Sequence, residues 1–95
     1  MVTVNIPYHE VTVSGKFVRL TPKEWEILAF LSKNGGRVVS RNDILTVWPE
    51  GQRGDVEPRT VDQHIARVRL KMGKHCPIET VNGYGYKAKG VKIID

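Results

Sequence analysis

The chain has 95 residues, of which 40% are hydrophobic, and a formal net charge of +5. This length suits a single domain, and no stretch reaches the roughly 18 to 20 apolar residues that a membrane-spanning helix needs. One cysteine, Cys76, excludes an internal disulfide. No basic region followed by an apolar run opens the chain, so we expect a soluble, cytoplasmic protein without a membrane partner.

Residues 2–20 alternate between apolar and polar side chains in a pattern that predicts short β-strands. The strands are expected at 2–6, 11–13 and 17–20, with a tight turn around Ser14 and Gly15. A sheet this small needs a helix against one face to be stable. Residues 1–20 should therefore form an N-terminal antiparallel sheet, which either has a structural role or offers its edge as a docking surface.

A first helix is predicted to begin at Thr21. The residues Thr21-Pro22-Lys23-Glu24 combine an N-cap, a proline at the first helical position and a glutamate that returns a hydrogen bond to the cap. The helix should end near residue 34, where two glycines permit a left-handed cap. Its inward stripe is expected to consist of Trp25, Leu28 and Leu31. Phe30 lies off this stripe and either packs on the sheet or stays partly exposed.

A second helix is expected to begin at Ser40, which with Asp43 forms another capping box, and to run through Trp48. The apolar residues that should face the first helix are Ile44, Leu45 and Trp48. Residues 49–58 contain two prolines, two glycines and mixed charge, which predicts a loop. Long loops in compact domains are often functional. This loop either contacts a partner such as RNA polymerase or only connects two helices.

Residues 59–74 predict one amphipathic helix with many basic side chains. At about 100° per residue, a narrow apolar stripe must face the core, and it consists of Val61, Ile65, Val68 and Met72. The opposite side carries Arg59, Gln63, Ala66, Arg67, Leu70 and Lys74. Arginine can donate two hydrogen bonds to guanine, glutamine can pair with adenine, and small apolar side chains can touch a thymine methyl. This face suits the major groove of DNA.

A charged helix face is usually only a solvated face, so the distribution of charge along the chain matters. Residues 1–57 hold seven Lys/Arg and seven Asp/Glu, whereas residues 58–95 hold eight and three and carry the whole +5. Attraction to phosphates requires a one-sided positive field of this kind. The asymmetry favours a nucleic-acid partner.

Residues 78–89 predict a β-hairpin around Asn82-Gly83-Tyr84-Gly85, since Asn and Gly both tolerate a positive φ. No helix follows these glycines, so a phosphate-cradling nucleotide loop is not expected. A hairpin beside a basic helix can lie along a nucleic-acid backbone or enter a minor groove. Residues 91–95 are expected to be a tail that packs on the sheet.

No arrangement typical of an enzyme is evident in the sequence. Catalytic carboxylate pairs, Ser/His/Asp or Cys/His sets and a phosphate loop are missing. His75 beside Cys76 lacks further ligands at zinc spacing. Asp62 and His64 would point roughly 160° apart on a helix, so they cannot form a dyad. We expect neither catalysis nor a metal or cofactor.

Four blocks of sequence resemble the winged-helix DNA-binding domain of OmpR/PhoB-type bacterial response regulators. They are 20–24 with Leu28 and Leu31, 36–41 with Leu45 and Trp48, 59–69, and 80–86. Together they cover residues 17–89 nearly without interruption. The resemblance implies one α+β winged helix-turn-helix domain over 1–95, with an N-terminal antiparallel sheet, a three-helix core at 21–74 and a C-terminal hairpin wing at 78–89.

In this family the third helix enters the major groove and the wing lies at the adjacent minor groove. The implied base contacts are Arg59, Gln63, Ala66 and Arg67. The implied phosphate and backbone contacts are Arg41, Trp48, Thr60, His64, Arg69, Lys71, Thr80 and Tyr86. The implied wing contacts are Asn82, Tyr84 and Lys87. Asp62 is implied to be structural, held by a neighbouring arginine.

Two positions depart from the family pattern. Many members carry arginine where this chain has Asn82, so an inserted guanidinium is replaced by an amide or by Lys87. Ala66 and Leu70 stand where polar or basic residues are common, which indicates thymine-methyl contacts or fewer contacts.

The resemblance implies sequence-specific binding of duplex DNA for transcriptional regulation. Family members typically follow a phosphorylatable receiver domain and bind direct repeats as head-to-tail dimers, which we expect of the intact protein. The alternative is a winged helix used mainly for protein interaction or RNA binding, with residues 49–58 as the docking surface. A single-stranded partner would need aromatic platforms, and only Tyr84 and Tyr86 lie near the basic face.

Overall fold

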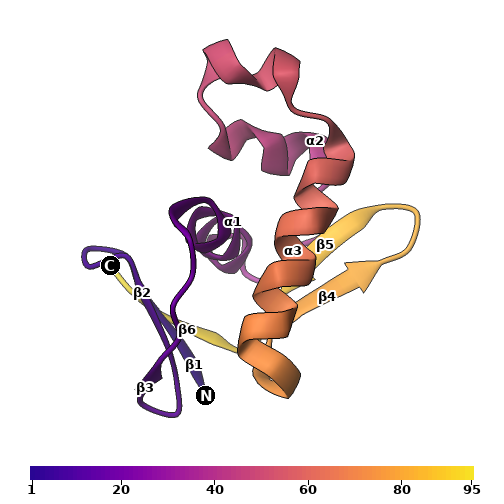
Figure 1. Ribbon diagram of the computed structural model, residues 1–95. Helices are drawn as coiled ribbons and strands as arrows, with labels where there is room; N and C mark the ends of the chain where they lie inside the picture. The colour runs from indigo at the N-terminus through magenta and orange to yellow at the C-terminus, as the bar shows by residue number, and fades with distance from the viewer.

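Two sheets flank three helices in the computed structural model, which describes every backbone position and the side-chain environment of all residues except 54 and 55 (Figure 1). The helices are α1 (Pro22–Lys33), α2 (Arg41–Ile44) and α3 (Pro58–Met72), with 3₁₀ segments η1 (Leu45–Val47), η2 (Glu50–Asp55) and η3 (Gly73–His75). The strands are β1 (Val2–Asn5), β2 (Glu10–Val13), β3 (Lys16–Phe17), β4 (Ile78–Val81), β5 (Gly85–Ala88) and β6 (Val91–Ile94). The predicted winged helix-turn-helix is confirmed. Among the described residues, no helix has the length and apolar character that crossing a bilayer requires.

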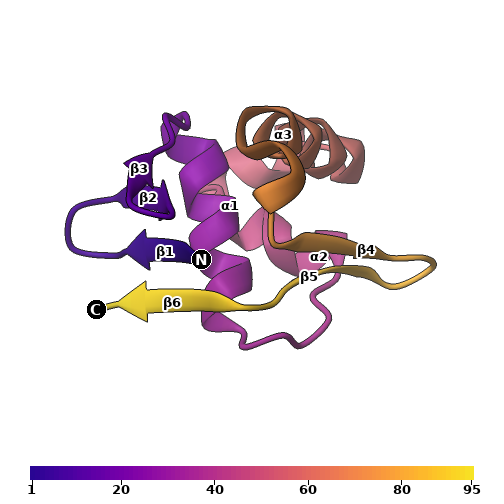
Figure 2. The same ribbon diagram turned by 90° about the horizontal axis from the view of Figure 1, so that it is seen from below.

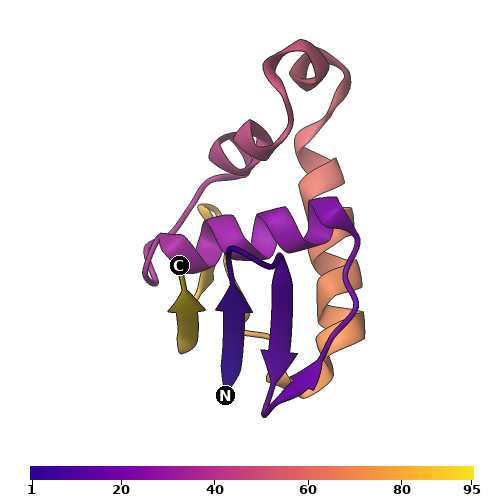
Figure 3. The ribbon, with the colours of Figure 1, turned by 90° about the vertical axis from the view of Figure 1, so that its left-hand side faces the viewer.

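The N-terminal sheet has the strand order β3-β2-β1-β6, and α1 crosses its strands (Figure 3). β1 and β2 pair antiparallel, as expected, but β6 pairs parallel to β1, with Thr3 opposite Lys92. The prediction that residues 91–95 pack on the sheet as a tail was wrong. Val91 and Ile93 alternate with more exposed residues, so the segment turns one side inward and satisfies its backbone at the sheet edge.

Both hydrogen bonds of the capping box predicted at the start of α1 are present. Thr21 Oγ1 accepts a hydrogen bond from the backbone N–H of Glu24 at 3.3 Å, and Glu24 Oε1 accepts one from the N–H of Thr21 at 2.9 Å. The expected inward stripe of Trp25, Leu28 and Leu31 is buried. Phe30 is half-buried and packs at the edge of the core.

The second helix is shorter than predicted. Its α-helical part ends at Ile44, η1 tightens into a 3₁₀ turn, and Trp48 is extended with ψ 141°. Pro49 explains the difference, because a residue before proline is pushed out of the helical region. Ile44 is fully buried and Trp48 nearly so, whereas Leu45 is only half-buried.

The segment predicted as a loop between the second and third helices contains the 3₁₀ segment η2. Arg53 holds this segment to the domain by donating from Nε to the carbonyl of Trp48 at 3.0 Å and from Nη2 to that of Thr46 at 3.3 Å. The side chains at 54 and 55, which belong to the predicted contact loop, lie outside the described part.

The apolar stripe of α3 is buried as predicted. Val61, Ile65 and Val68 are 0% exposed and Met72 is 5% exposed. Because these residues recur at helical spacing, they form one ridge that packs in the core and leaves the opposite side of the helix facing outward.

The wing turns through a three-residue loop that joins Val81 to Gly85. The predicted hairpin is confirmed, and within its loop Gly83 takes a positive φ, of 83°, whereas Asn82 does not. The wing is fixed to the core by two backbone hydrogen bonds between Val39 and Tyr86, of 2.7 and 2.9 Å.

Candidate nucleic-acid interface

The outer side of α3 is open to solvent along its whole length, and the wing stands beside it at the end of the domain away from the N-terminal sheet (Figure 2). All of the side chains expected on this outer side are exposed: Arg59, Gln63, Ala66, Arg67 and Leu70 on α3, and Lys74, which lies in η3 because α3 ends at Met72 and not at the predicted residue 74. Leu70 is the extreme case, at 84% exposed. We refer to these six residues as the outer face of α3.

The arginines of α3 differ in how far they are engaged. Arg59 Nε forms an exposed ion pair with Glu57 at 2.8 Å. Arg67 makes no hydrogen bond or ion pair with any residue whose side chain the structure describes, and the same holds for Gln63. Exposed ion pairs contribute little, about 0 to 1 kcal/mol, so Arg59 can exchange Glu57 for another anion at small cost.

Arg69 joins α3 to the wing. Its Nη2 donates to the carbonyl of Ile78 at 3.2 Å and to Thr80 Oγ1 at 2.8 Å, and its guanidinium lies over the ring of Tyr86 at 5.7 Å. The resemblance implied phosphate contacts for both Arg69 and Thr80. The structure instead turns these two side chains toward each other, so their first role is to hold the wing against the helix.

Lys71 of α3 lies outside the outer face and pairs with an acid from α1. Its Nζ lies 2.6 Å from Oε1 of Glu24, a residue that is only 1% exposed. The resemblance implied a phosphate contact for Lys71, which stays a prediction; in the free domain a buried carboxylate holds its ammonium. Burial would raise the pKa of Glu24, but hydrogen bonds from Lys71 and Thr21 and the charge of Lys71 outweigh it and lower that pKa.

Replacing Lys71 with methionine should destabilise the domain in a pH-dependent way. Because the folded pKa of Glu24 is lowered, its contribution exists above about pH 4.5 and is lost as the pH falls through the folded pKa. We expect a loss of about 1 kcal/mol at pH 7, after discounting for the partly exposed ammonium, and a smaller loss near pH 4. Urea unfolding at both pH values measures this difference. The variant Lys74→Met, at an exposed position, should show no such dependence on pH, and equal behaviour of the two variants would contradict the pairing.

A cluster of three side chains lies where the beginnings of α2 and α3 meet the wing. Asp62 Oδ1 accepts hydrogen bonds from Arg41 Nε at 3.0 Å and from the hydroxyl of Tyr86. The expectation that an arginine holds Asp62 is thus confirmed. Burial and the hydrogen bond to Asp62 raise the pKa of Tyr86, so its hydroxyl keeps its proton at neutral pH and acts as a donor.

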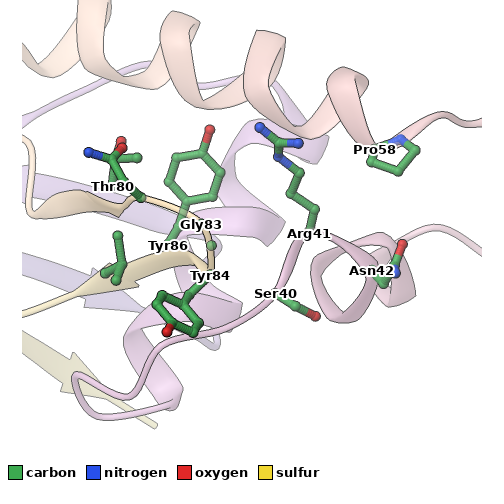
Figure 4. Close-up of a pocket in the computed structure, with 11 residues that line it drawn as sticks. Ser40, Arg41, Asn42, Pro58, Thr80, Gly83, Tyr84 and Tyr86 are labelled. Carbon is green, nitrogen blue, oxygen red and sulfur yellow. The ribbon is translucent and has the colours of Figure 1, made fainter.

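Two members of this cluster, Arg41 and Tyr86, border an open cavity of about 430 Å³ (Figure 4). In the close-up, the guanidinium of Arg41 and the hydroxyl of Tyr86 point the same way, toward α3. Asn42 and Pro58 also border the cavity, and neither was predicted from the sequence to lie at a site. Their position depends on α2 and α3 coming together, for which no local sequence signal exists.

Trp48, which follows η1, contacts His64 of α3, with ring centroids 5.3 Å apart in an edge-to-face arrangement. The ammonium of Lys23 lies 5.2 Å from the centre of the indole, and Trp48 is 8% exposed. The Nδ1 atom of His64 is 2.8 Å from the carbonyl oxygen of Thr60. Trp48 is therefore mainly a core residue, whereas Thr60 and His64 lie half-buried at the edge of the outer face.

The tip of the wing carries an exposed aromatic side chain. Tyr84 is 76% exposed, and Asn82 beside it is also exposed. Lys87, farther down the wing, faces Glu79 with Nζ 3.7 Å from a carboxylate oxygen. Asn82 and Tyr84 are thus the implied wing residues that stand free at the tip.

A winged helix with an exposed, basic third helix and a projecting hairpin defines a nucleic-acid-binding class, and comparison with known proteins gives the family. The model for "Transcriptional regulatory protein, C terminal" matches residues 15–88. The transcriptional regulatory protein ResD of Bacillus subtilis is 46% identical over 85 residues, covering 83% of this chain and 35% of ResD. The chain belongs to the OmpR/PhoB-type family of C-terminal DNA-binding domains of transcriptional regulators.

Solved structures agree with this assignment. The DNA-binding domain of Bacillus subtilis CssR has a TM-score of 0.74 and 33% identity, covering 93% of this chain and 99% of that one. The DNA-binding domain of the response regulator AdeR, solved in complex with an intercistronic region, has a TM-score of 0.79 over 94% of each chain, and its 24% identity supports the fold alone. The present chain spans about a third of the length of the curated relatives it matches.

Proposed function

We propose that this domain binds duplex DNA sequence-specifically in transcriptional regulation, with α3 in the major groove and the wing at the adjacent minor groove. The observation that carries the proposal is the division of α3 into a fully buried apolar ridge and an exposed face on which Gln63 and Arg67 have no described partner. A helix about 10 to 12 Å across fits a major groove about 12 Å wide. Arginine and glutamine are side chains that read guanine and adenine there.

Within this proposal, the predicted contact residues fall into groups according to the part of the DNA that each group meets. Arg59, Gln63, Ala66 and Arg67 face the bases. Arg41, Trp48, Thr60 and His64 lie toward one flanking backbone, and Asn82 and Tyr84 lie at the minor groove. Thr80 and Tyr86 hold the wing in place through Arg69 and Asp62, and the wing in turn brings them close to the DNA backbone. Lys87 pairs with Glu79.

The distribution of charge supports the same orientation. Residues 58–90, which contain α3 and the wing, hold seven Lys/Arg and two Asp/Glu and so carry the whole net charge of +5, while residues 1–57 and residues 91–95 are each neutral. A domain with this asymmetry presents its positive side to a phosphate backbone and releases counterions when it binds.

A salt titration tests the proposed function. Duplexes would be selected from a random pool by binding to the domain, and the affinity for the selected sequence would be measured between about 50 and 300 mM salt, with slopes of about −0.9 per neutralised phosphate. Three or four cationic contacts predict a slope of about −3 to −4 in a plot of log affinity against log salt. RNA of the same sequence should compete poorly. A flat response, or displacement by RNA at equal concentration, would favour a protein-binding or RNA-binding role instead.

We propose four further properties of the intact protein, of which only the dimer rests on the family. The domain acts by binding rather than by catalysis, in the cytoplasm; the protein binds direct repeats as a dimer; and residues 49–58 contact RNA polymerase. The last is supported by the position of η2, whose residues 50–53 are exposed at the outer end of the domain and are anchored there through Arg53 (Figure 1).

A further inference from the structure

Asp62 is an acid next to a surface that we propose binds polyanionic DNA. It lies in the first turns of α3, and its side chain is 33% exposed. A carboxylate at such a place repels phosphate, at about 1 kcal/mol for unit charges 4 Å apart in water and more where water is excluded. Since the carboxylate of Asp62 would repel the DNA phosphates, we look for a favourable contribution to binding that offsets this repulsion.

The contacts of Asp62 show what this role can be. The hydroxyl of Tyr86 donates to Oδ1 and holds the carboxylate from the wing side, and Arg41 Nε donates to the same oxygen from the α2 side. Tyr86 is itself fixed, since its backbone pairs with Val39 and its side chain is 7% exposed. The carboxylate is thus an anchored acceptor rather than a freely moving one.

The geometry leaves most of the Arg41 guanidinium available. Only Nε is used, and no residue within the described part accepts a hydrogen bond from its two terminal nitrogens. The Arg41 side chain is 53% exposed and borders the open cavity between α2, α3 and the wing (Figure 4). A free arginine loses up to about 2 kcal/mol of rotamer entropy when it is fixed, and an arginine already held through Nε loses less on binding.

From these contacts we infer that Asp62 is a positioning residue: it holds the guanidinium of Arg41 so that its terminal nitrogens meet a backbone phosphate of bound duplex DNA at this cavity. The inference rests on the proposed function and predicts the direction of one effect on DNA affinity. Removing the Asp62 carboxylate weakens DNA binding, although it makes the domain more positive.

The matched pair Asp62→Ala and Glu79→Ala tests the predicted direction of the affinity change, because each variant removes one carboxylate close to the proposed interface. Affinity for the selected duplex would be measured at fixed salt, with circular dichroism to verify folding. We expect Asp62→Ala to bind about tenfold more weakly, the scale of one charge-assisted hydrogen bond. Glu79→Ala should bind equally or more tightly. Asp62→Asn, which keeps an acceptor oxygen, should recover part of the loss and provides the comparison if the alanine variant is unstable.

A second arm uses Arg41→Ala as the background. If Asp62 acts through Arg41, adding Asp62→Ala to Arg41→Ala should cause no further loss and can restore some affinity, since only the repulsion remains. The salt slope of Asp62→Ala should also become shallower by up to about 0.9. Unchanged or tighter binding by Asp62→Ala alone would overturn the positioning role while leaving the proposed function intact. Failure of the unmodified domain to bind any selected duplex would instead reject the proposed function.

Discussion

Replacing Gly85 with alanine is expected to destabilise the domain by at least about 3 kcal/mol. Gly85 has φ 150°, a conformation that residues with a side chain rarely adopt, and a Cβ built on it would lie 2.1 Å from the carbonyl oxygen of Val39. That oxygen accepts the backbone hydrogen bond of Tyr86, which pins the wing to the core. The methyl group can be accommodated only if the pairing of Val39 with Tyr86 is broken.

Gly83→Ala is the matched control for this substitution. Gly83 also has a positive φ, of 83°, but no atom of the described residues lies within 4 Å of a Cβ placed there. Its replacement should therefore cost only about 1 to 2 kcal/mol for the left-handed backbone. Urea unfolding followed by tryptophan fluorescence measures both variants. An equal loss of unfolding free energy in the two variants would contradict the prediction that the contact between Gly85 and Val39 leaves no room for a side chain.

Replacing Arg67 with alanine is expected to reduce affinity for the selected duplex about 10- to 100-fold, the loss of one bidentate arginine–guanine contact. Arg67 is exposed at the middle of the outer face and has no partner among the residues whose side chains are described. Its guanidinium is therefore available without first breaking an internal contact. Folding should be unaffected for the same reason.

The charge-matched control for Arg67 is Lys92→Ala, since Lys92 is an exposed cation on β6 in the N-terminal sheet. The affinity of that variant for the selected duplex should fall by less than about threefold, because distant surface charges are screened. Measuring both variants on the selected duplex and on a random duplex separates the roles of Arg67. A loss restricted to the selected duplex identifies a base contact, whereas an equal loss on both would mark Arg67 as a phosphate contact.

The elements with strong local signals could be predicted from the sequence. The capping box at Thr21 and Glu24 is a contact between residues three apart, so the sequence shows both partners at once. The ridge of Val61, Ile65 and Val68 follows from helical periodicity alone. The same periodicity assigns the outer face, because whatever lies opposite a buried stripe faces outward.

The contacts that were missed connect residues far apart in the chain. Lys71 pairs with Glu24 across 47 positions, and no pattern on α3 distinguishes a lysine that faces solvent from one that reaches an acid on α1. Arg69 meets Thr80 only because the wing folds back beside α3. The short α2 is a different case, since Pro49 after Trp48 was a local signal against a helix reaching that residue.

The pairing of β6 was missed for a related reason. A strand at a sheet edge and an apolar tail share the same alternating sequence, and only the presence of an unpaired edge on β1 decides between them. Tertiary contacts therefore engage several of the expected DNA-contacting side chains within the free domain, and the exposed centre of α3 is the part of the predicted site that the sequence indicates most directly.

The central claim is that the outer face of α3 is the surface that meets DNA. The most direct measurement is an amide chemical-shift map of the isotopically labelled domain titrated with the selected duplex. We expect the largest shifts at Gln63, Ala66 and Arg67 and at the wing tip around Tyr84, with the N-terminal sheet at residues 2–17 nearly unchanged. Shifts concentrated on that sheet, with α3 unaffected, would contradict the claim.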